Sequence, residues 1–237
     1  MSSYTKSILF ALLTAVICSF LLTAGSAGLK SRQLENIEVD KKKNILKAVG
    51  LLESADRLAK EAIRDIYSNK IRGLWVTPEG EILDTDTPAE TSLPVYLYVR
   101  DGNVAAYILP VNTRGLWGKI FGYLALESDG STVSGFTVYK HSETPGLGGE
   151  IEKRWFQSNF KGKKILDRSG NLVSISIAKG SIPASFPEEQ LPHYVDGISG
   201  ATLTGRFLTA GLKRVLLDYE PISIKFRSRM TIEIKEE

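Results

Sequence analysis

Cysteine is almost absent from this sequence of 237 residues, since Cys18 is the only one. A single thiol excludes an intrachain disulfide, and it cannot hold a Cys-rich zinc site or an iron–sulfur cluster within this chain. The two histidines, His141 and His193, have no carboxylates at metal-ligand spacing. We therefore predict no metal site, and any redox chemistry must use another kind of cofactor.

A strong excess of either charge is also missing. The 30 Lys and Arg residues nearly balance the 27 Asp and Glu residues, which leaves a net charge of +3 at pH 7. Nucleic-acid binding needs a concentrated basic face, and so small an excess does not supply one. We expect no nucleic-acid partner.

One long stretch near the N-terminus lacks charge altogether. It covers 23 residues, Ser7 to Leu29, between Lys6 and Lys30. At about 1.5 Å per residue, a helix of this length crosses a hydrocarbon core of roughly 30 Å. The small residues from Ala24 to Gly28 also fit the cleavage region of a secretory signal peptide, but the run exceeds the roughly 7 to 15 residues of a signal core. We predict a retained transmembrane helix over residues 7–29.

Basic residues flank this span unequally. Lys6 precedes it, whereas Lys30, Arg32 and Lys41 to Lys43 follow it. The positive-inside rule alone would place the following domain in the cytoplasm. Because residues 30–237 are long enough to be translocated largely regardless of charge, the pattern leaves the side of the membrane open.

Apolar residues at helical spacing mark three further segments. From Lys42 to Lys70 the spacing predicts an amphipathic juxtamembrane helix within residues 30–70. Residues 149–160 and 205–219 show the same periodicity. We expect residues 71–237 to form one domain, because no linker interrupts them.

Short runs rich in β-branched and aromatic residues predict strands. They are Pro94 to Val99, Val104 to Leu109, Thr132 to Tyr139 and Leu172 to Ala178. Hairpin-sized turns beside these runs, such as Asp101-Gly102-Asn103, favour antiparallel pairing. The sequence therefore predicts an α+β fold, with one N-terminal transmembrane helix followed by a single domain that has a mainly antiparallel sheet and flanking helices.

Two glycine-rich segments fail as nucleotide-binding signatures. Residues 146–151 have Ile where the third glycine of G-x-G-x-x-G would stand, and residues 115–120 contain Gly-Lys without the spacing or the Ser/Thr of a P-loop. No pair of carboxylates stands out for acid–base work. We therefore predict no catalytic residue in this chain.

The loop from His141 to Glu150 is unusual because it holds three glycines and a proline. Such a backbone can turn sharply and approach a flat ligand closely. Leu147 offers an apolar surface beside it, and Thr144 offers a hydroxyl. The alternative is a plain connection between a strand and a helix.

A second unusual segment lies just ahead of the last predicted helix. Ser199, Thr202 and Thr204 are natural N-cap residues, so the segment can serve simply to cap that helix. Alternatively, the free N–H groups and the positive end of the helix dipole hold a phosphate there. The small residues Gly200 and Ala201 would leave a threonine hydroxyl open to a bulky reagent, as attachment of a phosphoester requires.

In this order, the two segments resemble the FMN-binding domains in which riboflavin monophosphate is esterified to the last threonine of a Ser/Thr-Gly-Ala-Thr motif. Ser199-Gly200-Ala201-Thr202 matches all four positions, and Asp196 matches the acidic residue before them. Gly115-Leu116-Trp117 and the loop 143–150 extend the resemblance, which is greatest to the C subunits of the bacterial Na+-translocating NADH:quinone oxidoreductases. The G subunit of the Rnf electron-transport complex shares both motifs and is the alternative. Lys153-Arg154 depart from the Asn-Pro expected there, which puts the start of the predicted helix in doubt.

The resemblance also implies which residues form the FMN site. They are Asp196, Ser199, Gly200, Ala201, Thr202, Glu143, Thr144, Gly146, Leu147, Gly148 and Lys179. Within this set, Thr202 carries the phosphoester, Glu143 orders the loop, and Lys179 contacts the phosphate or the ring. Trp117 is expected in the core rather than against the flavin.

The function implied by the resemblance is electron transfer. The chain would be a subunit of a six-subunit membrane complex that oxidises NADH, reduces ubiquinone and exports Na+, and it would not be catalytic alone. A separate flavin transferase would attach the FMN. Members of the family are single-pass proteins of the bacterial inner membrane, with a cytoplasmic N-terminus and a periplasmic flavin domain. The resemblance therefore implies the opposite orientation to the one that the count of basic residues favours. A membrane-tethered binding domain without redox function is the further alternative.

Overall fold

The computed structural model describes residues 2–52, 58–83 and 88–228, and the chain divides into two compact units at Asp40. The first unit consists of helix α1 (Ser3–Ala48) as far as Asp40. Within the described ranges, α1 is the one helix that is long and apolar enough to cross a membrane. The predicted span therefore lies in a single helix, which also continues without a break through residues 24–28.

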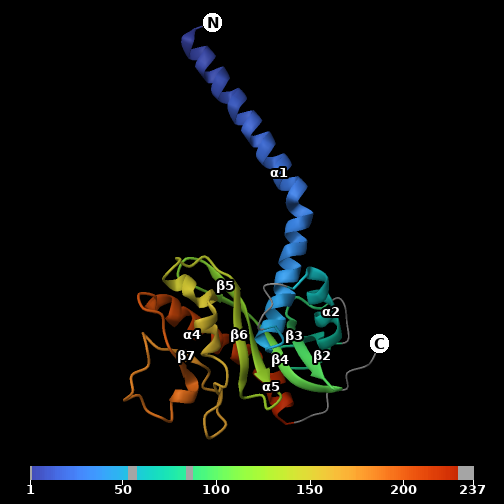
Figure 1. Ribbon diagram of the computed structural model, residues 1–237, viewed down its shortest axis with the longest axis vertical. Coiled ribbons are helices and arrows are strands. Elements are labelled where there is room, and N and C mark those ends of the chain that lie inside the picture. The colour runs from blue at the N-terminus through green and yellow to red at the C-terminus, as the bar shows by residue number, and fades with distance from the viewer. Residues whose placement is uncertain (1, 53–57, 84–87, 229–237) are drawn as a thin grey trace. The chain divides into compact units, whose positions relative to one another are not determined.

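The second unit is built around a six-stranded antiparallel sheet (Figure 1). Its strands are β1 (Ile71–Val76), β2 (Ile82–Leu83), β3 (Leu93–Arg100), β4 (Asn103–Arg114), β5 (Lys119–Glu127) and β6 (Val133–Lys140), in the order β2-β1-β3-β4-β5-β6. From β3 onward each strand pairs with the next one along the chain. This confirms the predicted α+β fold with a mainly antiparallel sheet.

The hairpin between β3 and β4 has the turn that the sequence predicts. Asp101 and Gly102 both adopt positive φ, at 52° and 76°, which is the conformation of a tight two-residue hairpin turn. Arg100 pairs with Asn103 across this turn. Two of the four predicted strand runs lie within β3 and β4, and a third, Thr132 to Tyr139, matches β6 except for its first residue.

One face of the sheet packs against the C-terminal helices α4 (Thr202–Asp218) and α5 (Glu220–Arg227). Leu208 and Leu212 of α4 join the buried cluster that includes Leu109 of β4. From α5, the ring of Phe226 stacks on that of Tyr107 with centroids 4.2 Å apart. The predicted helix at residues 205–219 is thus confirmed, and its apolar face closes the main core.

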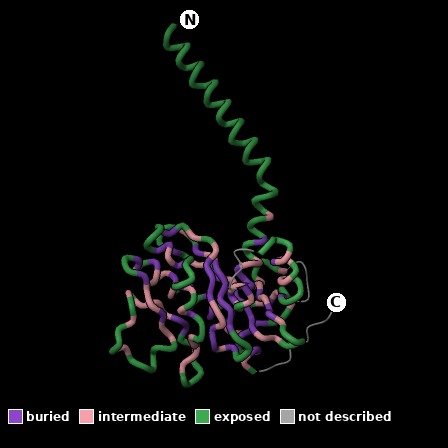
Figure 2. The backbone as a smooth tube through the Cα atoms, in the orientation of Figure 1, coloured by how far each residue is buried: buried purple, intermediate pink, exposed green. Residues whose placement is uncertain are grey.

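The opposite face of the sheet is covered by the segment that follows Asp40. Thr137 Oγ1 donates a hydrogen bond to the carbonyl oxygen of Asn44 at 3.3 Å. Gly135 approaches the chain so closely that an added Cβ would lie 2.4 Å from the carbonyl oxygen of Ala48. Because both faces are covered, the strands are buried along much of their length (Figure 2).

The continuous helix predicted from Lys42 to Lys70 is wrong. Helix α1 ends at Ala48, Gly50 takes a positive φ of 73°, and the separate helix α2 covers Lys60–Lys70. Residues 53–57 lie outside the described residues. Since a left-handed glycine commonly ends a helix, Gly50 is the physical reason for the break.

Two other predicted elements differ from those observed. The run 172–178 forms only the two-residue strand β7 (Ser176–Ile177), because Ser174 adopts a positive φ of 69° that interrupts an extended chain. Strand β7 pairs in parallel with β8 (Tyr194–Val195). The helix predicted over 149–160 is a 3-10 turn, η2 (Gly148–Glu152), followed by the short helix α3 (Arg154–Ser158). Lys153 between them is extended, which separates the two.

Gly211 of α4 faces β4 at a very close approach. An added Cβ would lie 1.8 Å from Thr113 Oγ1, so Gly211→Ala must displace the helix from the sheet. We expect a loss of about 1–3 kcal/mol in the free energy of unfolding, although alanine favours helices. Thermal melting of the full chain in detergent measures the change.

Gly73→Ala is the matched control, because its Cβ would meet Tyr96 at an ordinary 3.8 Å. Equal melting temperatures for the two variants would contradict the close packing of α4 on β4.

Candidate functional site

A cavity of about 270 Å³ opens where three segments meet in the second unit. These segments are the turn between β4 and β5, the loop after β6 and the first turn of α4. The lining residues are Leu116, Trp117, Glu143, Thr144, Leu147, Gly148, Gly200, Ala201, Thr202, Leu203 and Thr204. The structure thus brings together both segments that the sequence singles out.

The loop after β6 folds back on itself through its own backbone. The N–H groups of Leu147 and Gly149 both donate to the carbonyl oxygen of Thr144, at 3.1 and 2.9 Å. Gly146 supports this turn with a positive φ of 73°. The turn leaves the side chain of Leu147 exposed at the mouth of the cavity.

The first turn of α4 forms the opposite wall of the cavity. Its N-cap residue is Ala201, which has no side-chain oxygen to accept a hydrogen bond from the helix. The alternative in which Ser199, Thr202 or Thr204 caps the helix through its side chain is therefore wrong. The first N–H groups of an α-helix have no partner within the helix, and here the residues that carry them line the cavity.

Glu143 ties this helix to the turn between β4 and β5. The residue is 5% exposed, and its Oε2 accepts a hydrogen bond from Thr204 Oγ1 at 2.5 Å. Oε1 accepts a hydrogen bond from the backbone N–H of Trp117 at 3.0 Å. Glu143 thus joins three separate segments of the chain.

Glycines make room for this carboxylate. A Cβ added at Gly115 would lie 2.5 Å from Glu143 Oε1, and one added at Gly148 would lie 2.7 Å from Oε2. The same Cβ at Gly148 would also lie 2.5 Å from Thr204 Oγ1. Side chains at either position would collide with the link, so both glycines are needed where they stand.

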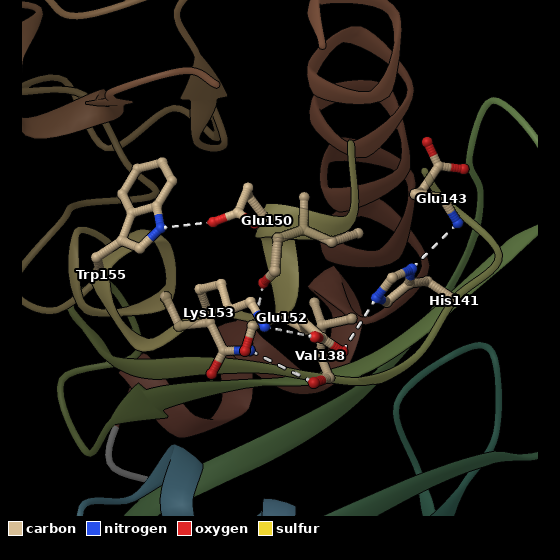
Figure 3. A network of polar contacts seen from close by, with 9 residues as sticks. Val138, His141, Glu143, Glu150, Glu152, Lys153 and Trp155 are labelled. Atoms are coloured by element: carbon tan, nitrogen blue, oxygen red, sulfur yellow. Dashed lines mark hydrogen bonds and ion pairs between the residues drawn. The ribbon is translucent and has the colours of Figure 1, made fainter. Parts of the chain in front are cut away.

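A polar network holds the loop and the residues that follow it (Figure 3). The backbone N–H of Glu143 donates to His141 Nδ1 at 3.1 Å, and His141 Nε2 lies 3.3 Å from Glu152. Hydrogen bonds from Lys153 and His141 lower the pKa of Glu152. Figure 3 shows the carboxylate of Glu143 pointing away from this network.

Exposed apolar side chains surround the mouth of the cavity. Trp117 is 69% exposed, Leu203 is 49% exposed and Leu147 is 43% exposed. The expectation that Trp117 belongs to the core is therefore wrong. Leu116, Leu203 and Thr204 were not predicted as site residues, although all three lie within the segments that the sequence singles out.

Four of the predicted site residues, Gly146, Lys179, Asp196 and Ser199, lie outside the described lining of the cavity. Asp196 instead accepts a hydrogen bond from the backbone N–H of Ile182 at 2.7 Å, which fixes the approach to the Ser199 segment. Lys179 is exposed after β7. Gly146 and Ser199 are the immediate neighbours in sequence of the lining residues Leu147 and Gly200.

The cavity suits a flat ligand that carries a phosphate. Trp117 and Leu147 offer apolar surface to a ring system, and the uncapped start of α4 offers backbone N–H groups to an anion. Thr202, the first residue of α4, is only partly buried and also lines the cavity. A hydroxyl therefore lies where the anion would bind.

Comparisons with known proteins agree with this geometry. The sequence model of the FMN-binding domain family matches residues 115–217, which contain all three segments of the cavity. The C subunit of the Na(+)-translocating NADH-quinone reductase of Yersinia pestis is 34% identical over 232 residues, covering 85% of this chain and 84% of the relative. The corresponding C subunit from Pseudomonas aeruginosa is 32% identical and covers 86% and 88%.

A solved structure has the same fold. It is the crystal structure of the C subunit of the Na(+)-translocating NADH-quinone reductase from Parabacteroides distasonis, with a TM-score of 0.69 and 31% sequence identity. The similarity covers 86% of this chain and 98% of that one. The chain therefore belongs to the family formed by the C subunits of the Na+-translocating NADH-quinone reductases.

Proposed function

We propose that this chain is an electron-transfer subunit of a Na+-translocating NADH:ubiquinone reductase and that it carries FMN as a phosphoester on Thr202. One observation supports the attachment site above all others. Thr202 lines the cavity at the uncapped start of α4, and no hydrogen bond occupies its hydroxyl within the described residues. Membership of the family supports the electron-transfer role.

The attachment needs only an accessible hydroxyl from this chain. A separate flavin transferase would supply FAD, and Thr202 Oγ1 would displace AMP from it. The bond between Oγ1 and the phosphorus of the FMN half forms, the anhydride bond between the two phosphates breaks, and the hydroxyl proton is lost. The N–H groups at the start of α4 would then face the phosphoester charge.

The exposed rim supports an electron relay rather than a closed active site. A cavity of about 270 Å³ is small beside pockets of roughly 300–1,000 Å³ that enclose whole ligands, so part of an isoalloxazine ring would stay uncovered. Flavin exchanges electrons singly or in pairs. An uncovered ring edge would let other subunits of a six-subunit complex pass electrons from NADH towards ubiquinone.

The N-terminal helix supports a single membrane anchor in the bacterial inner membrane. Its uncharged stretch from Ser7 to Leu29 has the length to cross the hydrocarbon core. In the proposed orientation the N-terminus is cytoplasmic and the flavin domain periplasmic. This tether would keep the flavin domain beside its membrane partners.

Thr202→Val should abolish covalent flavin attachment, because valine keeps the volume and lacks the nucleophilic oxygen. Thr202→Ser keeps the hydroxyl and should still be modified. Intact mass after expression with the flavin transferase measures both. A full flavin mass on Thr202→Val would contradict the proposed site.

Trp117→Leu should raise the fluorescence of the attached flavin, because an indole close to the ring quenches it by electron transfer. Trp155→Leu is the matched control, since Trp155 is also exposed but bonds to Glu150 and does not line the cavity. Emission is compared in the folded protein. Equal emission from both variants would place the ring away from Trp117.

The orientation can be tested by thiol labelling, because Cys18 is the only native thiol. In a Cys18→Ser background, Ser181→Cys should react with a membrane-impermeant maleimide in intact spheroplasts. Ser2→Cys should react only after permeabilisation, since it precedes the span. The opposite labelling pattern would place the flavin domain in the cytoplasm.

A further inference from the structure

Two threonines of the first turn of α4 line the same cavity but differ in environment. Thr204 is 1% exposed, and its hydroxyl donates to Glu143 at 2.5 Å. Thr202 is only partly buried, and within the described residues its hydroxyl makes no hydrogen bond. Of these two hydroxyls, which are separated by a single residue, one is buried and hydrogen-bonded and the other is not hydrogen-bonded.

The partner of Thr204 is a buried carboxylate that no cation neutralises within the described ranges. Both oxygens of Glu143 are taken by neutral donors, Thr204 Oγ1 and the backbone N–H of Trp117. Burial of a carboxyl group is costly unless its oxygens are hydrogen-bonded, and here both oxygens are. The hydrogen bonds of Glu143 therefore stabilise the contact between the loop after β6 and the first turn of α4.

Thr204 also has no room to react. A Cβ added at Gly148 would lie 2.5 Å from Thr204 Oγ1, which shows how closely the loop covers that oxygen. Transfer of a phosphoryl group requires the attacking oxygen to approach phosphorus in line with the leaving oxygen. The covered hydroxyl of Thr204 does not allow this approach, whereas Thr202 at the cavity does.

We propose that Glu143 is a positioning residue that directs flavin attachment to Thr202. By holding Thr204, it fixes the first turn of α4 against the turn at Trp117 and so presents the hydroxyl of Thr202 to the cavity. The same bond removes Thr204 as a competing acceptor. This inference rests on the proposed attachment of FMN to Thr202 and adds what selects that residue.

A matched pair at Thr204 tests the bond itself. Thr204→Val keeps the shape and removes the donor, and Thr204→Ser keeps the donor and removes only a methyl group. We expect the initial rate of modification of Thr204→Val to fall by about tenfold or more, since it loses the hydrogen bond that holds the first turn of α4 to Glu143. Thr204→Ser should be modified at nearly the wild-type rate.

The rates are measured on the full chain in detergent, with the flavin transferase and FAD, by in-gel fluorescence and by mass mapping of the modified peptide. Thermal melting before modification checks that each variant is folded. Thr204→Val should still accept flavin on Thr202 after long incubation, because its acceptor is intact.

A second pair of variants, at Glu143, distinguishes the effect of the hydrogen bonds from the effect of the carboxyl group itself. Glu143→Gln retains an oxygen for the N–H of Trp117 and an amide group that can donate to Thr204, so it should be modified at close to the wild-type rate. Glu143→Ala removes both contacts and should be as slow as Thr204→Val or slower.

Several results would overturn the inference while leaving the proposed function intact. They are wild-type rates for Thr204→Val, a slower rate for Thr204→Ser than for Thr204→Val, and a rate for Glu143→Gln as low as that of Glu143→Ala. Flavin found on Thr204 of the wild-type chain would overturn both the inference and the proposed site. A wild-type chain that accepts no flavin at all would defeat the proposed function itself.

Discussion

The buried carboxylate of Glu143 is the contact on which the geometry of the site depends. Its two oxygens and its backbone N–H connect the turn before β5, the loop after β6 and the first turn of α4. The sheet and the helix alone would not fix the positions of these three short segments relative to one another. One buried carboxyl group with hydrogen bonds on both oxygens fixes all three, and Gly115 and Gly148 are the small residues that admit it.

The remaining features of the site are unsatisfied in the isolated chain. Helix α4 begins at Thr202 without a side-chain cap, and apolar side chains such as Trp117 and Leu147 stand exposed beside it. In a protein that worked alone, the uncapped helix start and the exposed apolar side chains would both lower the free energy of unfolding. Under the proposed function, the phosphate of FMN would satisfy the helix start and its ring would cover part of the rim. Partner subunits would cover the apolar surface that remains, as expected for one component of a larger redox complex.

Much of the fold follows from local patterns, and the exceptions have physical causes. Asp101-Gly102 specifies its hairpin, and the helical periodicity after Gly205 specifies α4, because both signals are local. The break at Gly50 and the turn at Ser174 depend on positive φ values that no periodicity reveals. Strand β5 was not predicted because its run of buried residues lacks alternation. In the site, the motifs located both walls of the cavity, but the exposure of Trp117 and the bond between Thr204 and Glu143 depend on tertiary contacts.

The central claim is the covalent tether at the start of α4. Its most direct test is peptide mass mapping of this chain, purified from its native membrane and run on a denaturing gel. We expect a fluorescent band and one modified peptide, with FMN on the oxygen of Thr202. A band without flavin, or a flavin attached to any other residue, would contradict it.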